Sequence, residues 1–228
     1  MKTSLRSIDV FSDLSDSLID TLTRRHWKVN GREDSPIYLA DDSANLVYFL
    51  FSGRVRIFFP TTKERSITLD FLRSGSFFGE QSLNKFEIRG EAAETMESST
   101  LGVIPSDFFR TLMDEHSELS SAIFDYVNRR RWHIQNRLKM LAYEDARKRL
   151  IYVLLDLADL ITQKSIVDDE VTINMTHQQF AEMSGLARPT VTKLLNALEE
   201  EKYLSLGQGE VHLNRPIEMR NLLGSRYV

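Results

Sequence analysis

The chain has 228 residues, of which 42% are hydrophobic and 27% are charged, and its net charge is −4. This length favours two modest domains over one large one, and the composition is typical of folded globular proteins. The sequence contains no cysteine, which excludes disulfides, thiolate catalysis and cysteine-ligated iron–sulfur clusters.

Residues 1–115 predict a short helical segment followed by an antiparallel β domain. Apolar residues follow helical spacing over residues 7–25. Between residues 29 and 105 apolar and polar residues alternate in short runs, for example over 67–71, and glycines separate the runs. This pattern is typical of an antiparallel barrel or jelly roll.

Residues 116–142 predict one long helix between two domains. Its apolar residues recur at steps of three, four and seven, close to a coiled-coil seam; they are Leu119, Ile123, Val127, Ile134, Leu138 and Leu141. Because such a helix cannot bury this stripe in either domain, we expect it to pair with a second copy and form a homodimer. The alternative is a helix packed on its own β domain. The arginines at 129–131 fan around the axis and are expected to be solvated.

Residues 176–201 have the features of two helices joined by a turn. Thr176 and Gln179 fit a capping box, Gly185 supplies the turn, and Pro189 suits the first turn of the second helix. A short hairpin over 203–213 would then form the wing of a winged helix-turn-helix domain. The alternative interpretation is a helical hairpin and ribbon that only pack within the domain.

The second of these helices would have one buried and one exposed face. Its apolar residues fall at i, i+3, i+4 and i+7, namely Val191, Leu194, Leu195 and Leu198. On the opposite face, Arg188 can make paired hydrogen bonds to guanine, and Lys193 can reach phosphates or base edges. The DNA-binding residues expected here are Thr176, His177, Gln178, Arg188, Pro189, Thr190, Thr192, Lys193 and Asn196. Because residues 142–228 hold ten Lys and Arg against thirteen Asp and Glu, net −3, this surface must be local.

Three segments resemble the CRP/FNR (catabolite activator protein and fumarate–nitrate reductase regulator) family of bacterial transcription regulators. They are VYFLFSGRV at 47–55, GSFFGE at 75–80 and GLARPTVTK at 185–193, and the resemblance covers essentially the whole chain. It implies an α+β fold with a cyclic-nucleotide-binding-like jelly roll (1–115), a dimerisation helix (116–142) and a winged helix-turn-helix domain (143–228).

The resemblance also implies a function and partners. The chain would be a dimeric, sequence-specific regulator that binds a near-palindromic double-stranded DNA operator and RNA polymerase, the latter through the loop 163–170. The family's guanine-binding arginine falls on Arg188, and its phosphate-side residues fall on Thr190 and Lys193. Ala187 and Pro189 depart from a frequent serine and glutamate, so the operator sequence cannot be copied from known relatives.

An effector pocket is implied at Gly79, Glu80 and Arg89, with Ile134 and Gln135 approaching from the long helix. In cyclic-nucleotide-binding members the glutamate holds the ribose, and an arginine–serine pair holds the phosphate. Here Gly90 replaces that serine, and Ile134 and Gln135 replace the threonine–serine pair expected for cyclic AMP. The alternative for Glu80 and Arg89 is a mutual ion pair.

Three possibilities for the effector therefore remain, namely a cyclic nucleotide, another small molecule, or no effector. In the last case the protein would be regulated by its own abundance. Haem is not expected, because its candidate ligands His26, His116 and His133 are isolated in the sequence.

Two other classes of function compete. The sequence has no phosphate-binding loop, no G-x-S-x-G and no histidine pair at metal spacing, so we do not expect an enzyme. The second is a DNA-independent, cyclic-nucleotide-binding signalling module. Because there is no apolar window of about 18 residues and no signal-peptide pattern, we expect a cytoplasmic protein without membrane contact.

Overall fold

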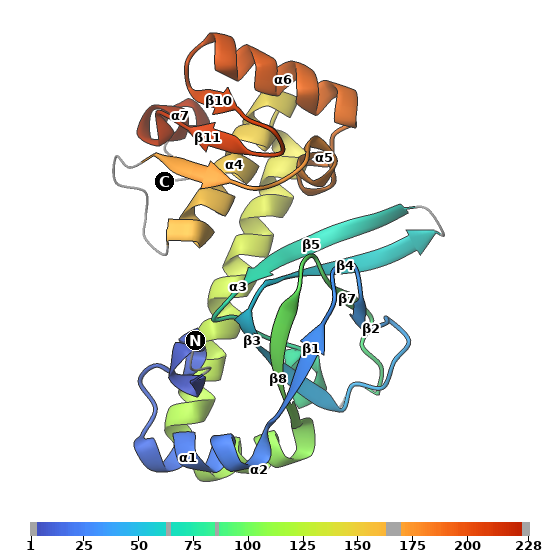
Figure 1. Ribbon diagram of the computed structural model, residues 1–228, viewed down its shortest axis with the longest axis vertical. Coiled ribbons are helices and arrows are strands. Elements are labelled where there is room, and N and C mark those ends of the chain that lie inside the picture. The colour runs from blue at the N-terminus through green and yellow to red at the C-terminus, as the bar shows by residue number, and fades with distance from the viewer. Residues whose placement is uncertain (1–3, 63–64, 85–86, 163–169, 225–228) are drawn as a thin grey trace. The chain divides into compact units, whose positions relative to one another are not determined.

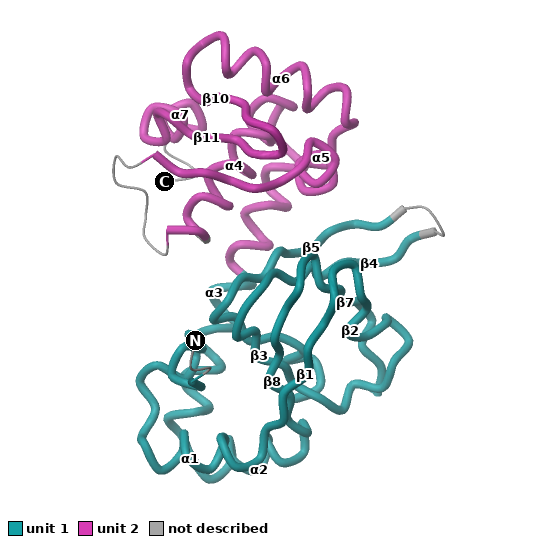
Figure 2. Tube along the Cα trace, in the orientation of Figure 1, with its two compact units in different colours: residues 1–131 teal, residues 132–228 magenta. Residues whose placement is uncertain are grey.

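The computed structural model describes residues 4–62, 65–84, 87–162 and 170–224. The chain forms two compact units, 1–131 and 132–228, and the boundary between them falls inside one long helix (Figure 2). Among the helices of the described ranges, none is long and apolar enough to cross a membrane.

The first unit contains two antiparallel four-stranded sheets (Figure 1), which confirms the predicted jelly roll. The first sheet has the order β1 (Trp27–Gly31), β8 (Ser99–Pro105), β3 (Leu46–Ser52) and β6 (Phe77–Phe78). The second has the order β2 (Pro36–Tyr38), β7 (Ala92–Thr95), β4 (Arg54–Thr62) and β5 (Arg65–Arg73). The helices are three 3-10 turns (Leu5–Ser7, Asp9–Phe11, Glu80–Leu83), α1 (Asp16–Arg25), α2 (Ser106–Glu115) and the first part of α3 (Ser117–Tyr143).

Strand β3 is apolar from Leu46 to Phe51, where both of its faces are covered, and only its last residue, Ser52, is polar and exposed. Val47, Phe49 and Phe51 belong to a core shared with the helices, and Tyr48 and Leu50 belong to the core between the sheets. Successive side chains of a strand point to opposite faces. A run of apolar residues without alternation is therefore what a central, fully covered strand requires.

The predicted helix over 7–25 is not continuous. The structure has two 3-10 turns up to Phe11, and α1 begins only at Asp16. The Asp9 N–H donates to the Gly75 carbonyl at 2.8 Å. This long-range bond takes a backbone donor that a continuous helix would use internally, so tertiary contact overrides the helical pattern here.

The apolar residues of the long helix divide into a buried group and an exposed group. Leu119 and Ile123 are buried in the core of the first unit, so for them the expectation of a dimer seam was wrong and the packed alternative holds. Farther along α3, Trp132, Tyr143 and four residues of one heptad register are exposed, and these four are Phe124 (68%), Val127 (37%), Leu138 (59%) and Leu141 (36%). The exposed stripe therefore includes Phe124, which the sequence pattern had not selected.

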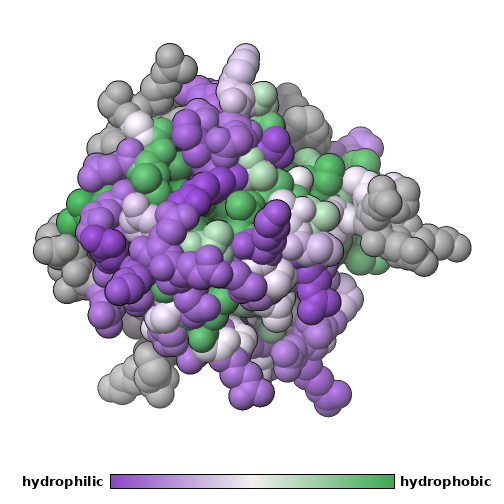
Figure 3. Space-filling view, turned by 90° about the horizontal axis from the view of Figure 1, so that it is seen from above, coloured by the Kyte–Doolittle hydropathy of each residue, from purple (hydrophilic) through white to green (hydrophobic). Residues whose placement is uncertain are grey.

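The second unit is a winged helix-turn-helix domain, as predicted. After the remainder of α3 it contains α4 (Ala146–Thr162), β9 (Val171–Ile173), α5 (His177–Ser184), α6 (Arg188–Glu200), β10 (Leu204–Leu206), β11 (Val211–Leu213) and α7 (Pro216–Leu223). Its sheet is antiparallel, in the order β10-β11-β9. Hydrophilic side chains cover most of the face seen in Figure 3, and small hydrophobic areas lie between them.

Candidate functional site

Helix α5 begins and ends at the residues expected from the sequence. The Gln179 N–H donates to the Thr176 hydroxyl at 3.3 Å, and the Thr176 N–H donates to the Gln179 side chain at 2.8 Å, which completes the capping box. Gly185 follows the helix with a left-handed φ of +64°. A glycine adopts this conformation without strain, so the chain can turn sharply into α6.

One hydrogen bond between α5 and α6 was not anticipated. His177 Nδ1 lies 2.9 Å from the Thr192 hydroxyl oxygen, and this hydroxyl also donates to the Arg188 carbonyl at 3.1 Å. Since the hydroxyl has a single proton, both bonds form together only when His177 carries a proton on Nδ1. Two residues predicted to bind DNA therefore also hold the two helices together.

The other predicted DNA-binding residues are free to meet solvent. Seven of them are exposed, namely Thr176, Gln178, Arg188, Pro189, Thr190, Lys193 and Asn196, while His177 and Thr192 are half-buried. On the opposite side of α6, Val191, Leu195 and Leu198 are buried as predicted, and Leu194 is half-buried. The helix thus presents one continuous polar face.

Two arginines outside this face position the helices. Arg137 of α3 donates to the Met183 carbonyl at the end of α5 at 2.7 and 3.1 Å. Arg147 of α4 donates to both carboxylate oxygens of Glu201, directly after α6, at 2.7 and 2.5 Å. Neither residue was selected from the sequence, because the partner of each lies more than 40 residues away along the chain.

In the first unit, the mutual ion pair of Glu80 and Arg89, which was the alternative to an effector pocket, does not form. Instead Glu80 accepts a hydrogen bond from Arg130 at 2.9 Å, and Arg130 also donates to Asp70 at 3.0 Å. The Arg130 side chain is only 10% exposed, so the expectation of a solvated arginine was wrong for this residue. The cause is tertiary: α3 places Arg130 against one carboxylate from strand β5 and one from the 3-10 turn Glu80–Leu83.

Arg89 is a buried cation whose hydrogen bonds go to backbone carbonyls. Its Nη2 donates to the Leu46 carbonyl at 2.8 Å, and its Nη1 lies 3.4 Å from the Gly79 carbonyl. The guanidinium lies 4.3 Å from the ring centre of Tyr38 and 5.4 Å from that of Tyr48. Gly79 has a left-handed φ of +78°, which favours glycine, and a Cβ there would lie 2.9 Å from Arg89 Nη1 and displace the guanidinium.

One buried polar atom of Glu80 and one of Arg89 have no hydrogen-bond partner. Among the side chains of the described ranges, only Glu80 Oε2 and Arg89 Nε are fully buried without a hydrogen bond. One is an acceptor and the other a donor. Because buried polar atoms are nearly always satisfied, this donor and this acceptor are available for hydrogen bonds to a polar molecule.

Glu91 is a member of this pocket that the sequence analysis missed. It is 5% exposed, and its Oε1 accepts a hydrogen bond from the Tyr38 hydroxyl at 3.3 Å. Burial raises the pKa of Glu91 to about 7; Arg130 opposes this shift and Glu80 adds to it. The one feature of the sequence that could have indicated a buried acid here is that Glu91 directly precedes two alanines of a buried strand.

Two predicted sites remain untested by this geometry. Ile134 is half-buried and Gln135 is exposed, but both belong to the second unit, so their approach to Arg89 stays a prediction. The expected polymerase-binding loop at 163–170 lies outside the described residues except for Glu170.

Comparison with known proteins gives matches for both units. Residues 28–116 match the family model of the cyclic nucleotide-binding domain, and residues 148–222 match that of the Crp-like helix-turn-helix domain. The cyclic AMP receptor protein of Thermus thermophilus is 28% identical over 181 residues, which cover 79% of this chain and 81% of that protein. The global nitrogen regulator of a Nostoc species is 28% identical over 186 residues, 80% of this chain and 83% of that protein. The structure of FixK2 from Bradyrhizobium japonicum superposes with a TM-score of 0.76 at 20% identity, covering 86% of this chain and 96% of that one.

Proposed function

This chain belongs to the CRP/FNR family of DNA-binding transcription regulators, and we propose that the polar face of α6 recognises its operator. The observation that supports this face is its exposure opposite a buried apolar face, in a hairpin fixed by the capping box and the His177–Thr192 bond. Nothing in the comparisons favours a DNA-independent signalling module.

The residues of this face would divide into two roles. Arg188 lies at the first position of α6 and is exposed, and a guanidinium at this place can donate two hydrogen bonds to a guanine edge. Thr190 and Lys193 would contact phosphates, which fixes the position of the helix but carries no sequence information. Pro189 has no N–H, so it could contact bases only through apolar atoms.

Substitution of Arg188 and Lys193 should separate these two roles. Arg188→Ala should weaken binding to the preferred operator by about 1–3 kcal/mol per half-site and relax the preference at one base pair. Lys193→Ala should weaken all sequences evenly and reduce the salt dependence of binding. Selection from a randomised DNA library at one fixed salt concentration measures both effects. An unchanged base preference in Arg188→Ala would show that this residue does not recognise a base.

The active form would be a homodimer. The exposed residues Phe124, Val127, Leu138 and Leu141 of α3 lie at steps of three, eleven and three, which places them at the a and d positions of one heptad register, as in a two-helix seam. A second copy of α3 would cover them. The two α6 helices of a dimer would then bind half-sites about 34 Å apart in successive major grooves.

A charge placed in this seam should dissociate the dimer. Leu138→Glu should raise the dissociation constant at least about a hundredfold, because the carboxylate would be buried without a partner. Lys139→Glu is the matched control, since Lys139 is exposed and lies beside the seam. Sedimentation velocity over a concentration series reports both. Equal behaviour of the two variants, or a monomeric wild type at micromolar concentration, would refute dimerisation through this face.

The effector site would be the pocket of Glu80 and Arg89. Its unsatisfied donor and acceptor suit a ligand that has both an anionic group, for Arg89, and a hydroxyl, for Glu80. A cyclic nucleotide has this chemistry, and the jelly roll matches the cyclic nucleotide-binding model.

The remaining partners follow from family membership. We propose that the dimer works in the cytoplasm and contacts RNA polymerase through the loop at 163–170.

A further inference from the structure

A second cavity lies at the open edge of the jelly roll, between β1 and β2. These are the terminal strands of the two sheets, so no further strand closes the gap between them. The cavity has a volume of about 410 Å³, and all of its lining residues belong to the first unit. This volume lies within the range of small-molecule sites, about 300–1,000 Å³.

This edge pocket is distinct from the proposed effector pocket. Gly79, Glu80 and Arg89 do not line it. Tyr48 forms the boundary: it lines the edge pocket, while its ring stacks on Phe78 with centroids 5.1 Å apart and lies 5.4 Å from the Arg89 guanidinium. A molecule in the edge pocket would therefore meet the opposite side of this aromatic layer.

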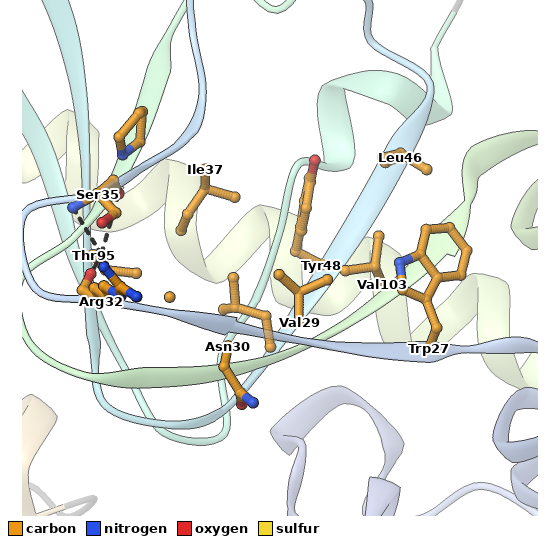
Figure 4. Close-up of a pocket in the computed structure, with 13 residues that line it drawn as sticks. Trp27, Val29, Asn30, Arg32, Ser35, Ile37, Leu46, Tyr48, Thr95 and Val103 are labelled. Carbon is orange, nitrogen blue, oxygen red and sulfur yellow. Dashed lines mark hydrogen bonds between the residues drawn. The ribbon is translucent and has the colours of Figure 1, made fainter.

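The walls of the edge pocket are mainly apolar. Figure 4 shows Val29, Ile37 and Tyr48 between Trp27 at one end and Arg32 at the other. Trp27 is 44% exposed and Val29 41% exposed, which leaves apolar surface in contact with water inside a concave site. Covering such surface is favourable roughly in proportion to its area, so the walls favour a ligand with an apolar body.

Among the polar groups that line the edge pocket, the Arg32 guanidinium is the one available to bind a charged ligand. The single proton of the Thr95 hydroxyl is shared between the carbonyls of Arg32 and Ser35, and its oxygen accepts from the Ser35 N–H at 3.1 Å, so it is satisfied within the protein. Arg32 is exposed, it is the only charged residue among those that line the cavity, and within the described part of the chain it makes no side-chain hydrogen bond or ion pair. An anionic group is the natural partner of a guanidinium placed in this way.

We propose that the edge pocket binds a small carboxylate with an aromatic or branched apolar body. The carboxylate would accept hydrogen bonds from Arg32, and the body would pack on Trp27, Val29 and Ile37. The walls lack a second cation, which disfavours a multiply charged ligand such as a nucleoside polyphosphate.

Calorimetry with 3-phenylpropionate tests this proposal, and 3-phenylpropanol is the neutral counterpart. The wild-type protein should bind the acid saturably, and Arg32→Gln should weaken this binding about ten- to a hundredfold while leaving the alcohol unaffected. Arg24→Gln is the matched control, because Arg24 is an exposed arginine that does not line the cavity. Val29→Trp should fill the pocket and weaken the binding of both compounds.

Three results would overturn the proposal. The first is that the acid shows no saturable binding up to about 10 mM. The second is that Arg32→Gln and Arg24→Gln weaken the binding of the acid equally. The third is that Arg89→Leu abolishes binding of the acid while Arg32→Gln leaves it unchanged. Cyclic AMP serves as a separate arm, in which Arg89→Leu should weaken binding and Arg32→Gln should not. If Arg89→Leu does not weaken cyclic AMP binding but the results for the acid are as expected, the proposed effector site is rejected and the proposal for the edge pocket is unaffected.

Discussion

Replacing Arg130 with leucine should lower the free energy of unfolding of the first unit by about 3–5 kcal/mol. Arg130 is buried, and it is the shared partner of Asp70 and Glu80. The substitution would remove the cation that these two half-buried carboxylates share. Removing one member of a buried ion cluster is costly mainly because the remaining charges cannot recover their hydration.

The measurement is urea denaturation followed by Trp27 fluorescence. The chain has two tryptophans, so a Trp132→Phe background leaves the one that lies in the first unit as the reporter. Protein concentration must be held constant, because association with a second copy would also stabilise the fold.

Two further variants make the Arg130 result specific. Arg129→Leu is the matched control, since Arg129 is an exposed neighbour on the same helix, and it should change the free energy of unfolding by no more than about 0.5 kcal/mol. Adding Asp70→Asn and Glu80→Gln to Arg130→Leu should restore most of the loss, because the two carboxylates that shared the Arg130 cation are then neutral. Similar effects of Arg129→Leu and Arg130→Leu would contradict the ion cluster.

Replacing Glu91 with glutamine should stabilise the first unit by about 3 kcal/mol at pH 8 and by little at pH 4.5. Glutamine keeps an oxygen that can accept from the Tyr38 hydroxyl, so the hydrogen bond seen in the structure is retained. What changes is the charge. Burial raises the pKa of Glu91 to about 7 in the folded protein, from a usual value of 4.5.

The direction of the effect follows from proton binding. Between pH 4.5 and 7 the folded state binds the Glu91 proton more tightly than the unfolded state does. The contribution of Glu91 to stability is therefore fully present below about pH 4.5, and it is lost as the pH rises through 7. The neutral glutamine has no such dependence.

Denaturation of the wild type and Glu91→Gln at several pH values isolates this contribution, because the difference between the two proteins removes the titration of all other groups. The difference should grow steadily from pH 4.5 to 7 and then level off. A difference that does not vary with pH would mean that Glu91 is ionised throughout in the folded protein.

The sequence by itself determined the features that depend on local chemistry. The two-residue alternation, the capping box of Thr176 and Gln179, the left-handed Gly185 and the early Pro189 all act within a few residues of the chain. These short-range rules were sufficient to predict the jelly roll, the winged helix-turn-helix domain and the polar face of α6. The family resemblance added the position of Gly79, Glu80 and Arg89, but not their partners.

The tertiary structure decided what depends on which distant segments meet. Asp70 and Glu80 lie 60 and 50 residues from Arg130 in the sequence, and only the packing of α3 on the sheets makes them its partners. The same applies to Glu91, whose protonation depends on burial. Periodicity could find an apolar stripe on α3, but only packing showed that Ile123 is covered by its own unit while Phe124 is not. The pairing of charges, the burial of an acid and the covering of an apolar face are all set by long-range contacts, which no short window of sequence contains.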